Sequence, residues 1–333
     1  MVNPGMHYRT LGKAGYSISE ISLGAWQLGA VWGQPFDAHV AAQTLEKAVE
    51  AGVTFIDTAD VYADGLSEKA VGAFVRAHRD EVHFATKCGR RLNPHNADGY
   101  NEKNIHGFVE DSLKNTGLDC LDLLQLHCPP WEVYYRPEVF ALLETLKREG
   151  KIAQYGVSVE KVEEALKAIE YPGVATVQLI FNMFRQRPAE LFFREAARRK
   201  VGIIVRVPLA SGLLAGAYAK DTSFGKDDHR TFNRKGEAFD RGETFSGLDF
   251  ERGVEAVDEL KKLFPQGASL AGFALRWILM FPEVSCVIPG ASRAEQAIRN
   301  AAVSEMPELS SRQMEGVTRV YEEFVKPFVH HYW

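Results

Sequence analysis

Short runs of apolar and β-branched residues alternate along the chain with longer segments in which apolar positions recur at helical spacing. Eight runs have the length and composition of β-strands: Ile21–Trp26, Phe55–Asp60, Val82–Cys88, Leu121–His127, Ile152–Ser158, Val174–Asn182, Val201–Leu209 and Val284–Pro289. Helical periodicity separates them, for example at Ala38–Glu50, Glu102–Asn115, Pro137–Arg148, Glu160–Ala168 and Pro188–Arg199. Several of the strands are almost continuously apolar, which is typical of a parallel sheet buried on both faces.

This order of elements predicts an α/β fold, a (β/α)8 TIM barrel that forms a single domain over residues 1–333. A Rossmann fold would need a GxGxxG turn after its first strand, and Gly24-Ala-Trp-Gln-Leu-Gly29 does not have that spacing. Two segments lie outside the pattern: a long polar loop after strand seven, residues 211–248, and a C-terminal helix and tail, residues 310–333. Ser310 and Gln313 have the spacing of a capping box at the start of that helix.

Composition narrows the class of protein. The 333 residues are 46% hydrophobic and 25% charged with a formal net charge of −5, which is typical of a soluble globular protein and argues against nucleic-acid binding. No apolar run has the length of a membrane span, and the N-terminus does not resemble a signal peptide. The four cysteines show no CxxC spacing, so we expect reduced thiols and a cytoplasmic protein. His330-His331 has no third ligand at suitable spacing, so no metal is expected.

Polar side chains gather where three neighbouring predicted strands end. Asp57 lies near the end of strand two and Tyr62 just after it, Lys87 lies near the end of strand three, and His127 ends strand four. Each alone has an ordinary structural explanation, such as a cap or a satisfied polar residue. The active site of an α/β barrel lies at the carboxyl ends of its strands, so the four together predict a catalytic site.

The motifs around these residues resemble the aldo-keto reductases. The resemblance runs from about Tyr8 to Ala302 and rests on Asp57-Thr-Ala-Asp-Val-Tyr62, Ala85-Thr-Lys87, Asp122-Leu-Leu-Gln-Leu-His127, Gly156-Val-Ser158, Pro208-Leu-Ala-Ser-Gly212 and Ile288-Pro-Gly-Ala-Ser-Arg293. It implies an NADPH-dependent oxidoreductase that reduces an aldehyde or ketone, including sugars or other hydroxylated carbonyls, with Tyr62 as the acid/base.

The chemistry needs these residue types. Hydride transfer to a carbonyl leaves an alkoxide, which must receive a proton. A phenol has a pKa of about 10, and a neighbouring ammonium lowers it, which suits Lys87 beside Tyr62. Asp57 would keep Lys87 charged. His127 would donate a hydrogen bond to the carbonyl oxygen.

The resemblance also implies a cofactor site. Ser158 and Gln178 would bind the nicotinamide carboxamide, and Arg206 would stack on the ring where many relatives carry an aromatic residue, unless it is a structural arginine paired with an acid. Arg293, at a helix N-terminus, would bind the 2′-phosphate of NADPH. The further cofactor residues are Gly24, Ala25, Trp26, Pro208, Leu209, Ser211, Gly212, Leu214, Gly290, Ser292, Gln296 and Asn300. Val159, Gly290 and Gln296 depart from the Asn, Lys and Arg of many relatives.

Substrate contacts are the least constrained part of the prediction. Trp26, Trp32 and Trp131 lie in loops after strands one and four and are expected to wall the pocket. Arg230, Arg234 and Arg241 in the long loop hint at hydroxylated or anionic substrates. Two other functions stay open: a nucleotide-binding redox sensor without significant turnover, and a Schiff-base lyase that uses Lys87 as its nucleophile. The oligomeric state is left undecided.

Overall fold

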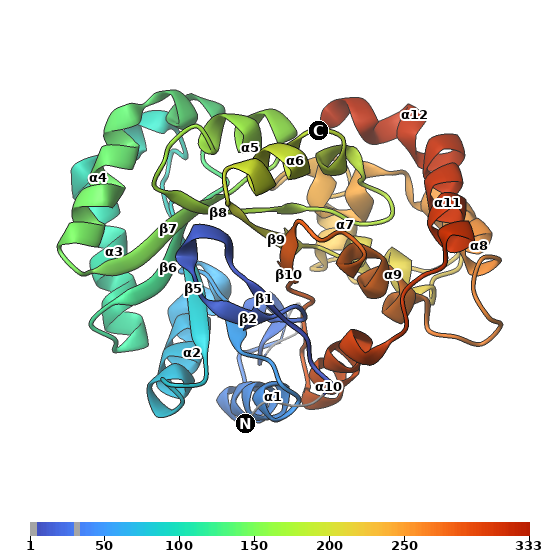
Figure 1. The fold of residues 1–333 in the computed structure, drawn as a ribbon, viewed down its shortest axis with the longest axis horizontal. Helices are drawn as coiled ribbons and strands as arrows, with labels where there is room; N and C mark the ends of the chain where they lie inside the picture. Colours follow the sequence, from blue (N-terminus) through green and yellow to red (C-terminus); the bar gives the residue numbers. More distant parts are fainter. Residues whose placement is uncertain (1–4, 30–33) are drawn as a thin grey trace.

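Eight parallel strands form a barrel in the computed structural model, which describes residues 5–29 and 34–333 (Figure 1). Neighbours along the sheet follow chain order: β3 (Leu23–Gly24), β4 (Phe55–Asp57), β5 (His83–Cys88), β6 (Leu121–His127), β7 (Ile152–Ser158), β8 (Val174–Ile180), β9 (Gly202–Arg206) and β10 (Val284–Val287). Bridges from Ile21 to Val287 and from Gly24 to Gly290 join the first strand to the last. The predicted TIM barrel and its eight strands are therefore confirmed.

Helices surround the barrel (Figure 1). The helices of the described residues are α1 (Ala38–Glu50), α2 (Leu66–Ala77), α3 (Glu102–Thr116), α4 (Pro137–Arg148), α5 (Val162–Ala168), α6 (Phe192–Arg198), α7 (His229–Phe232), α8 (Phe250–Lys261), α9 (Leu270–Leu279), α10 (Ala294–Ala301), α11 (Ser311–Val320) and α12 (Lys326–Val329). Local sequence explains several helix starts: Asp37 caps α1, Pro137 opens α4, and Ser310 with Gln313 forms the predicted capping box of α11. Within the described residues, no helix is both long enough and apolar enough to cross a membrane.

An N-terminal hairpin, which the periodicity did not predict, closes one end of the barrel. Its strands β1 (Tyr8–Thr10) and β2 (Ser17–Ser19) pair antiparallel. Between them, Gly12 lies so close to Gly202 at the start of β9 that an added Cβ would come within 2.0 Å of the Gly202 nitrogen. Leu11 and Ile18 pack with the buried apolar side chains of the barrel interior, including Phe55. The opposite end, where the strands finish, is left for a site.

The long loop after β9 is folded over that end. Short helical turns interrupt it, including α7, and it buries polar side chains such as Asn233 and Ser246. Asn182, just after β8, donates to the Val207 carbonyl (3.0 Å) and to the Ser246 hydroxyl (3.0 Å), so the barrel holds both ends of the loop. The predicted long loop after strand seven is thus present, and short helical turns and buried polar contacts order part of it.

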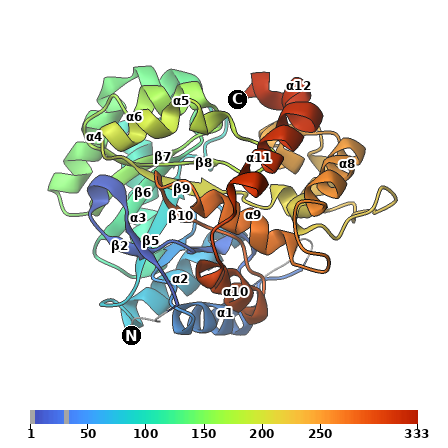
Figure 2. The same cartoon turned by 45° about the vertical axis from the view of Figure 1, so that its right-hand side comes forward.

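The C-terminal segment returns to the same end of the barrel (Figure 2). After α11 the helix widens by one π-helical turn over Tyr321–Val325 and continues as α12. The last residue, Trp333, is buried, and its ring lies 3.9 Å from the Arg185 guanidinium. Added Cβ atoms at Gly242 or Gly247 would collide with the Trp333 ring, at 2.9 and 2.7 Å. The tail therefore packs between the barrel rim and the long loop.

Candidate active site

The ammonium of Lys87 joins the predicted catalytic side chains. Lys87 Nζ donates to the Asp57 carboxylate, to the Thr58 carbonyl (2.8 Å) and, at 3.5 Å, reaches the Tyr62 hydroxyl. β4 and β5 are adjacent and in register from Phe55–His83 to Asp57–Ala85, which brings their carboxyl ends together. The rings of Tyr62 and His127 meet edge to face with centroids 6.0 Å apart. All four predicted side chains thus lie in one cluster.

Burial and charge set the protonation of this cluster. Burial alone would lower the pKa of Lys87, but the charge and hydrogen bond of Asp57, together with the Tyr62 hydroxyl, outweigh burial, and the pKa is raised. Burial raises the pKa of Tyr62, and Lys87 opposes that rise only in part. The expected lowering by the ammonium is therefore present, but it is smaller than the effect of removing the phenolate from water. Lys87 is a charged donor and Tyr62 a neutral phenol at neutral pH.

His127 is a neutral imidazole. Burial lowers its pKa well below the usual value, and the positive charges of Arg90 and Lys87 lower it further. Its Nδ1 atom is buried and has no hydrogen-bond partner among the described residues. A neutral ring keeps one N–H, so His127 can donate one hydrogen bond to a carbonyl oxygen.

Two glutamines complete the support of Asp57. Gln125 in β6 and Gln178 in β8 donate to Asp57 Oδ2 at 3.1 and 2.7 Å. Gln178, predicted to face the cofactor, thus has a structural task inside the barrel, and Gln125 was missed. Its position in the middle of a buried strand was the available signal, because a polar side chain there must find a partner.

A second charged cluster lies beside the first, at the ends of β5, β7 and β9. Arg206 donates to the Glu243 carboxylate and to the Val159 carbonyl (3.1 Å), while Arg90 pairs with Glu160 at 3.1 Å. Arg206 was predicted to stack on the nicotinamide ring, with a buried pair with an acid as the alternative. The structure shows the pair with an acid. Arg90, Glu160 and Glu243 were missed, although Arg90 and Glu160 directly follow predicted strands, the same signal that located the catalytic residues.

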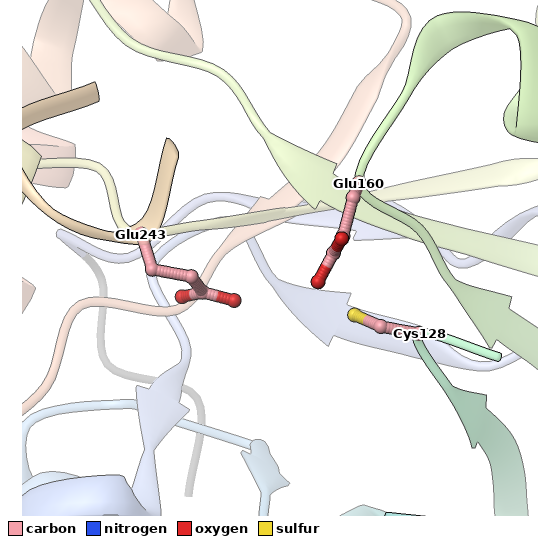
Figure 3. Close-up of side chains that lie close together, drawn as sticks. All are labelled: Cys128, Glu160 and Glu243. Carbon is pink, nitrogen blue, oxygen red and sulfur yellow. The ribbon is translucent and has the colours of Figure 1, made fainter. Parts of the chain in front are cut away.

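This cluster has the ligand geometry of a metal site but not its charge. The side chains of Cys128, Glu160 and Glu243 point toward one shared space (Figure 3), with ligand atoms within 4.8 Å of one another. Both carboxylates already pair with guanidinium groups, Arg206 on Glu243 and Arg90 on Glu160. Burial raises the pKa of the Cys128 thiol, which disfavours a thiolate ligand. The cluster is a balanced set of ion pairs.

The remaining predicted cofactor residues line the rim beyond Arg206. Ser211 donates to the Glu243 carbonyl (2.7 Å) and lies 3.3 Å from His229 Nε2. Ser158 ends β7 and is buried, with the Cys128 sulfur 3.6 Å from its hydroxyl. Pro208, Leu209, Gly212 and Leu214 lie with Ser211 at the start of the long loop. Gly24, Ala25 and Trp26 lie at the end of β3, and Gly24 bridges to Gly290.

Arg293 is the N-cap residue of α10 and is exposed. Its side chain makes no capping hydrogen bond, unlike the caps of α1, α3, α9 and α11. Gln296 accepts from the backbone and hydroxyl of Ser292 at 2.8 and 2.9 Å, and Asn300 donates to the Gly290 carbonyl. The N-terminus of α10 thus combines a partial positive charge with a guanidinium, a donor set suited to a phosphate.

Exposed aromatic residues flank the site. Trp131 is 62% exposed and stacks edge to face with Tyr135, and Trp26 is 39% exposed beside His229. The third predicted wall residue, Trp32, lies outside the described residues.

The three loop arginines have partners of different kinds. Arg230 pairs with Asp228, Arg234 donates to the Arg230 carbonyl, and Arg241 donates to the Gly247 carbonyl. The hint of an anionic substrate is therefore weakened for Arg230, whose charge is balanced by Asp228, and stays untested for Arg234 and Arg241.

Comparison with known proteins places this geometry in a family. The model of the "Aldo/keto reductase family" matches residues 20–322. The chain belongs to this family. It is 29% identical to the aldo-keto reductase YhdN of Bacillus subtilis, over 96% of this chain and 95% of YhdN. It is also 29% identical to a probable voltage-gated potassium channel subunit beta of Arabidopsis thaliana, over 95% and 97%. The glycerol dehydrogenase AKR11B4 of Gluconobacter oxydans has a similar structure, with TM-score 0.76, 26% identity and 96% coverage of both chains.

Proposed function

We propose that this aldo-keto reductase uses NADPH to reduce an aldehyde or ketone to the alcohol, with Tyr62 as the proton donor. The observation that carries the proposal is the single ammonium, Lys87 Nζ, that contacts the Asp57 carboxylate and lies 3.5 Å from the Tyr62 hydroxyl. His127 lies against the Tyr62 ring, which gives the carbonyl oxygen two donors from one side.

Each residue has a distinct task in the reaction. When bound, the reduced nicotinamide supplies the hydride. His127 orients the carbonyl oxygen, and Tyr62 gives its proton to that oxygen as negative charge develops there. Lys87 then stabilises the phenolate left on Tyr62. Asp57, held by Gln125 and Gln178, keeps Lys87 charged and in place.

The chain's own donors support the cofactor assignment. Arg206 Nε is buried and has no hydrogen-bond partner among the described residues, so the rim keeps a donor for a polar ligand group. Arg293 and the N-terminus of α10 would hold the 2′-phosphate that distinguishes NADPH from NADH. Replacement of Arg293 by alanine should weaken binding of NADPH much more than that of NADH, as measured by titration calorimetry.

A hydroxylated carbonyl suits the site better than a purely apolar one. Glu160 and Arg90 lie beside the catalytic cluster, both side chains about a quarter exposed (25% and 23%), and can bond substrate hydroxyls. Trp131 offers an apolar face for a sugar ring. The likeness to a glycerol dehydrogenase points to the same substrate class. A panel of aldoses, hydroxyaldehydes and simple aldehydes with NADPH, followed by nicotinamide absorbance, tests this choice.

The decisive experiment replaces Tyr62 by phenylalanine, which removes only the hydroxyl. We expect a loss of at least about 100-fold in turnover, because general acid catalysis contributes about that much or more. NADPH affinity should stay within about threefold of wild type. Full turnover in Tyr62→Phe would refute the role of Tyr62.

A second function, nucleotide sensing with little turnover, is favoured by the likeness to a potassium channel subunit beta. It predicts that wild type and Tyr62→Phe behave alike: both bind NADPH and neither reduces carbonyls. The lyase alternative is disfavoured, because burial lowers the pKa of Lys87 but Asp57 and Tyr62 together raise it by more, and the raised pKa leaves a protonated amine. Borohydride trapping of a carbonyl adduct on Lys87 would revive it.

A further inference from the structure

Arg206 is a charged residue at the position where an aromatic residue would stack on the nicotinamide ring. It is 8% exposed and ends β9, where its guanidinium also reaches the Cys128 sulfur at 3.6 Å, one residue beyond His127. A guanidinium can stack on a planar ring. Hydride transfer, however, turns the neutral reduced ring into a cation. A lone arginine against the ring would therefore disfavour the oxidised cofactor.

Glu243 provides the missing negative charge. Its carboxylate accepts from Arg206 Nη1, and both side chains are nearly buried. Burial alone would raise the pKa of Glu243, but the neighbouring guanidinium groups, Arg206 first and then Arg90 and Arg185, together outweigh burial and lower the pKa, so the carboxylate is charged at neutral pH. The same residue accepts from the Ser211 hydroxyl through its carbonyl, at 2.7 Å. One loop residue thus holds two predicted cofactor contacts.

The carboxylate also lies within electrostatic reach of the catalytic phenol. Burial is the main cause of the raised pKa of Tyr62, and the Glu243 charge adds to that rise. Glu243 therefore acts both on Arg206, which it contacts, and on the hydroxyl proposed to donate the proton.

We propose that Glu243 balances the affinities of this protein for the oxidised and reduced nicotinamide cofactor by neutralising Arg206. The proposal rests on the proposed function, because it requires the nicotinamide ring to lie against Arg206. Unit charges about 4 Å apart in a partly buried site interact strongly enough to change an affinity by tenfold or more. The positively charged oxidised ring feels this interaction and the neutral reduced ring does not.

Glu160 does not take this role. Its carboxylate pairs with Arg90, which lies on another strand end and is more exposed than Arg206. Burial raises the pKa of Glu160 to about 7, so its negative charge is incomplete at neutral pH. Of the two acids, Glu243 is the one that carries a full negative charge and contacts Arg206.

The test measures the dissociation constants of NADP⁺ and NADPH on the full chain by titration calorimetry. Glu243→Gln keeps an acceptor for Arg206 but removes the charge. It should raise the ratio of the NADP⁺ to the NADPH dissociation constant about tenfold. Arg206→Gln should shift the ratio in the opposite direction, and the double variant should return to within about threefold of wild type. Glu237→Gln, the same change at an exposed position of the loop, should leave the ratio unchanged.

The outcomes separate this inference from the proposed function. Equal weakening of both cofactor forms in Glu243→Gln would mean that Glu243 only holds the loop, and it would overturn the inference while the reductase assignment stands. A wild-type protein that binds neither form would instead refute the proposed function, and this inference with it.

Discussion

Two buried pairs of a cation with a carboxylate stand side by side at the rim of the barrel, and they are built in different ways. Lys87 and Asp57 come from adjacent strands, and Gln125 and Gln178 from the barrel interior fix the acid further. Arg206 also comes from a strand, but its partner Glu243 comes from the long loop. The first pair is held by the strands, whereas the second pair is one of the contacts that hold the loop on the barrel.

Because one pair joins two strands and the other joins a strand to a loop, we expect the two pairs to have different functions. A reacting proton needs a fixed geometry, and strand ends provide it. A bound cofactor must enter and leave, and a loop held by a few side-chain contacts, among them the Arg206–Glu243 pair and the Asn182–Ser246 hydrogen bond, can open at lower cost than a strand end. The tail strengthens the second region from outside, because Trp333 lies between Arg185 and the loop glycines.

The largest expected effect comes from breaking the strand-built pair. Lys87→Met leaves the Asp57 carboxylate buried without its cation, and we expect a loss of about 3–5 kcal/mol in the free energy of unfolding. Arg206→Met should cost less than about 2 kcal/mol, because Arg90 lies 3.8 Å from Glu243 and the loop can turn the acid toward water. Urea denaturation of both variants measures the difference.

A matched variant shows whether the loss in the free energy of unfolding comes from the unpaired Asp57 carboxylate. Asp57→Asn combined with Lys87→Met should recover most of the stability lost in Lys87→Met, since no buried charge is left unpaired. It should not recover turnover. Equal losses in Lys87→Met and Arg206→Met would show that the two pairs are held alike and would contradict the comparison.

The sequence predicted the region around the strand-built pair, Lys87 and Asp57. It did not predict the region around the loop-built pair, Arg206 and Glu243. Leu121–His127 and Ile152–Ser158 were predicted with the observed bounds because continuous apolar runs mark strands buried on both faces. Tyr62 and Lys87 followed from the rule for strand ends. Glu243 could not be found in this way, because its loop has no periodicity and its partner lies 37 positions away. The burial of Trp333 likewise depends on tertiary packing alone.

A smaller effect is expected from loosening the tail. Trp333→Ala removes a buried indole that packs on Arg185, and we expect a loss of about 2–3 kcal/mol, less than for a central tryptophan because a chain end can collapse into the space. Amide hydrogen exchange should rise in residues 240–247, which the ring contacts, but not in β5. Tyr332→Ala, at a neighbouring residue that is 40% exposed, should cost less than about 1 kcal/mol. Unchanged exchange in 240–247 would show that the tail does not support the loop.

The smallest effect is the pH dependence of stability contributed by Glu160, which lies with Arg90, Arg206 and Glu243 in the loop-built cluster. Burial raises the pKa of Glu160 to about 7, so between its ordinary value near 4.5 and about 7 the folded protein binds more protons than the unfolded chain. Stability from this group is therefore greatest at low pH and falls as the pH rises through that window. Because Glu160 is partly exposed and faces Arg90, the fall should not exceed about 2 kcal/mol.

Glu160→Gln should flatten the profile of unfolding free energy against pH between 5 and 7. Asp60, whose pKa burial also raises to about 7, contributes a slope of the same sign, so some slope should survive in Glu160→Gln and disappear only when Asp60→Asn is added. The strand-built pair should contribute no fall over this range, because Lys87 stays charged throughout, its pKa being raised by Asp57 against the effect of burial. A profile that Glu160→Gln leaves unchanged would mean that the acid is fully ionised beside Arg90. The loop-built cluster would then be as fixed in charge as the pair between the strands.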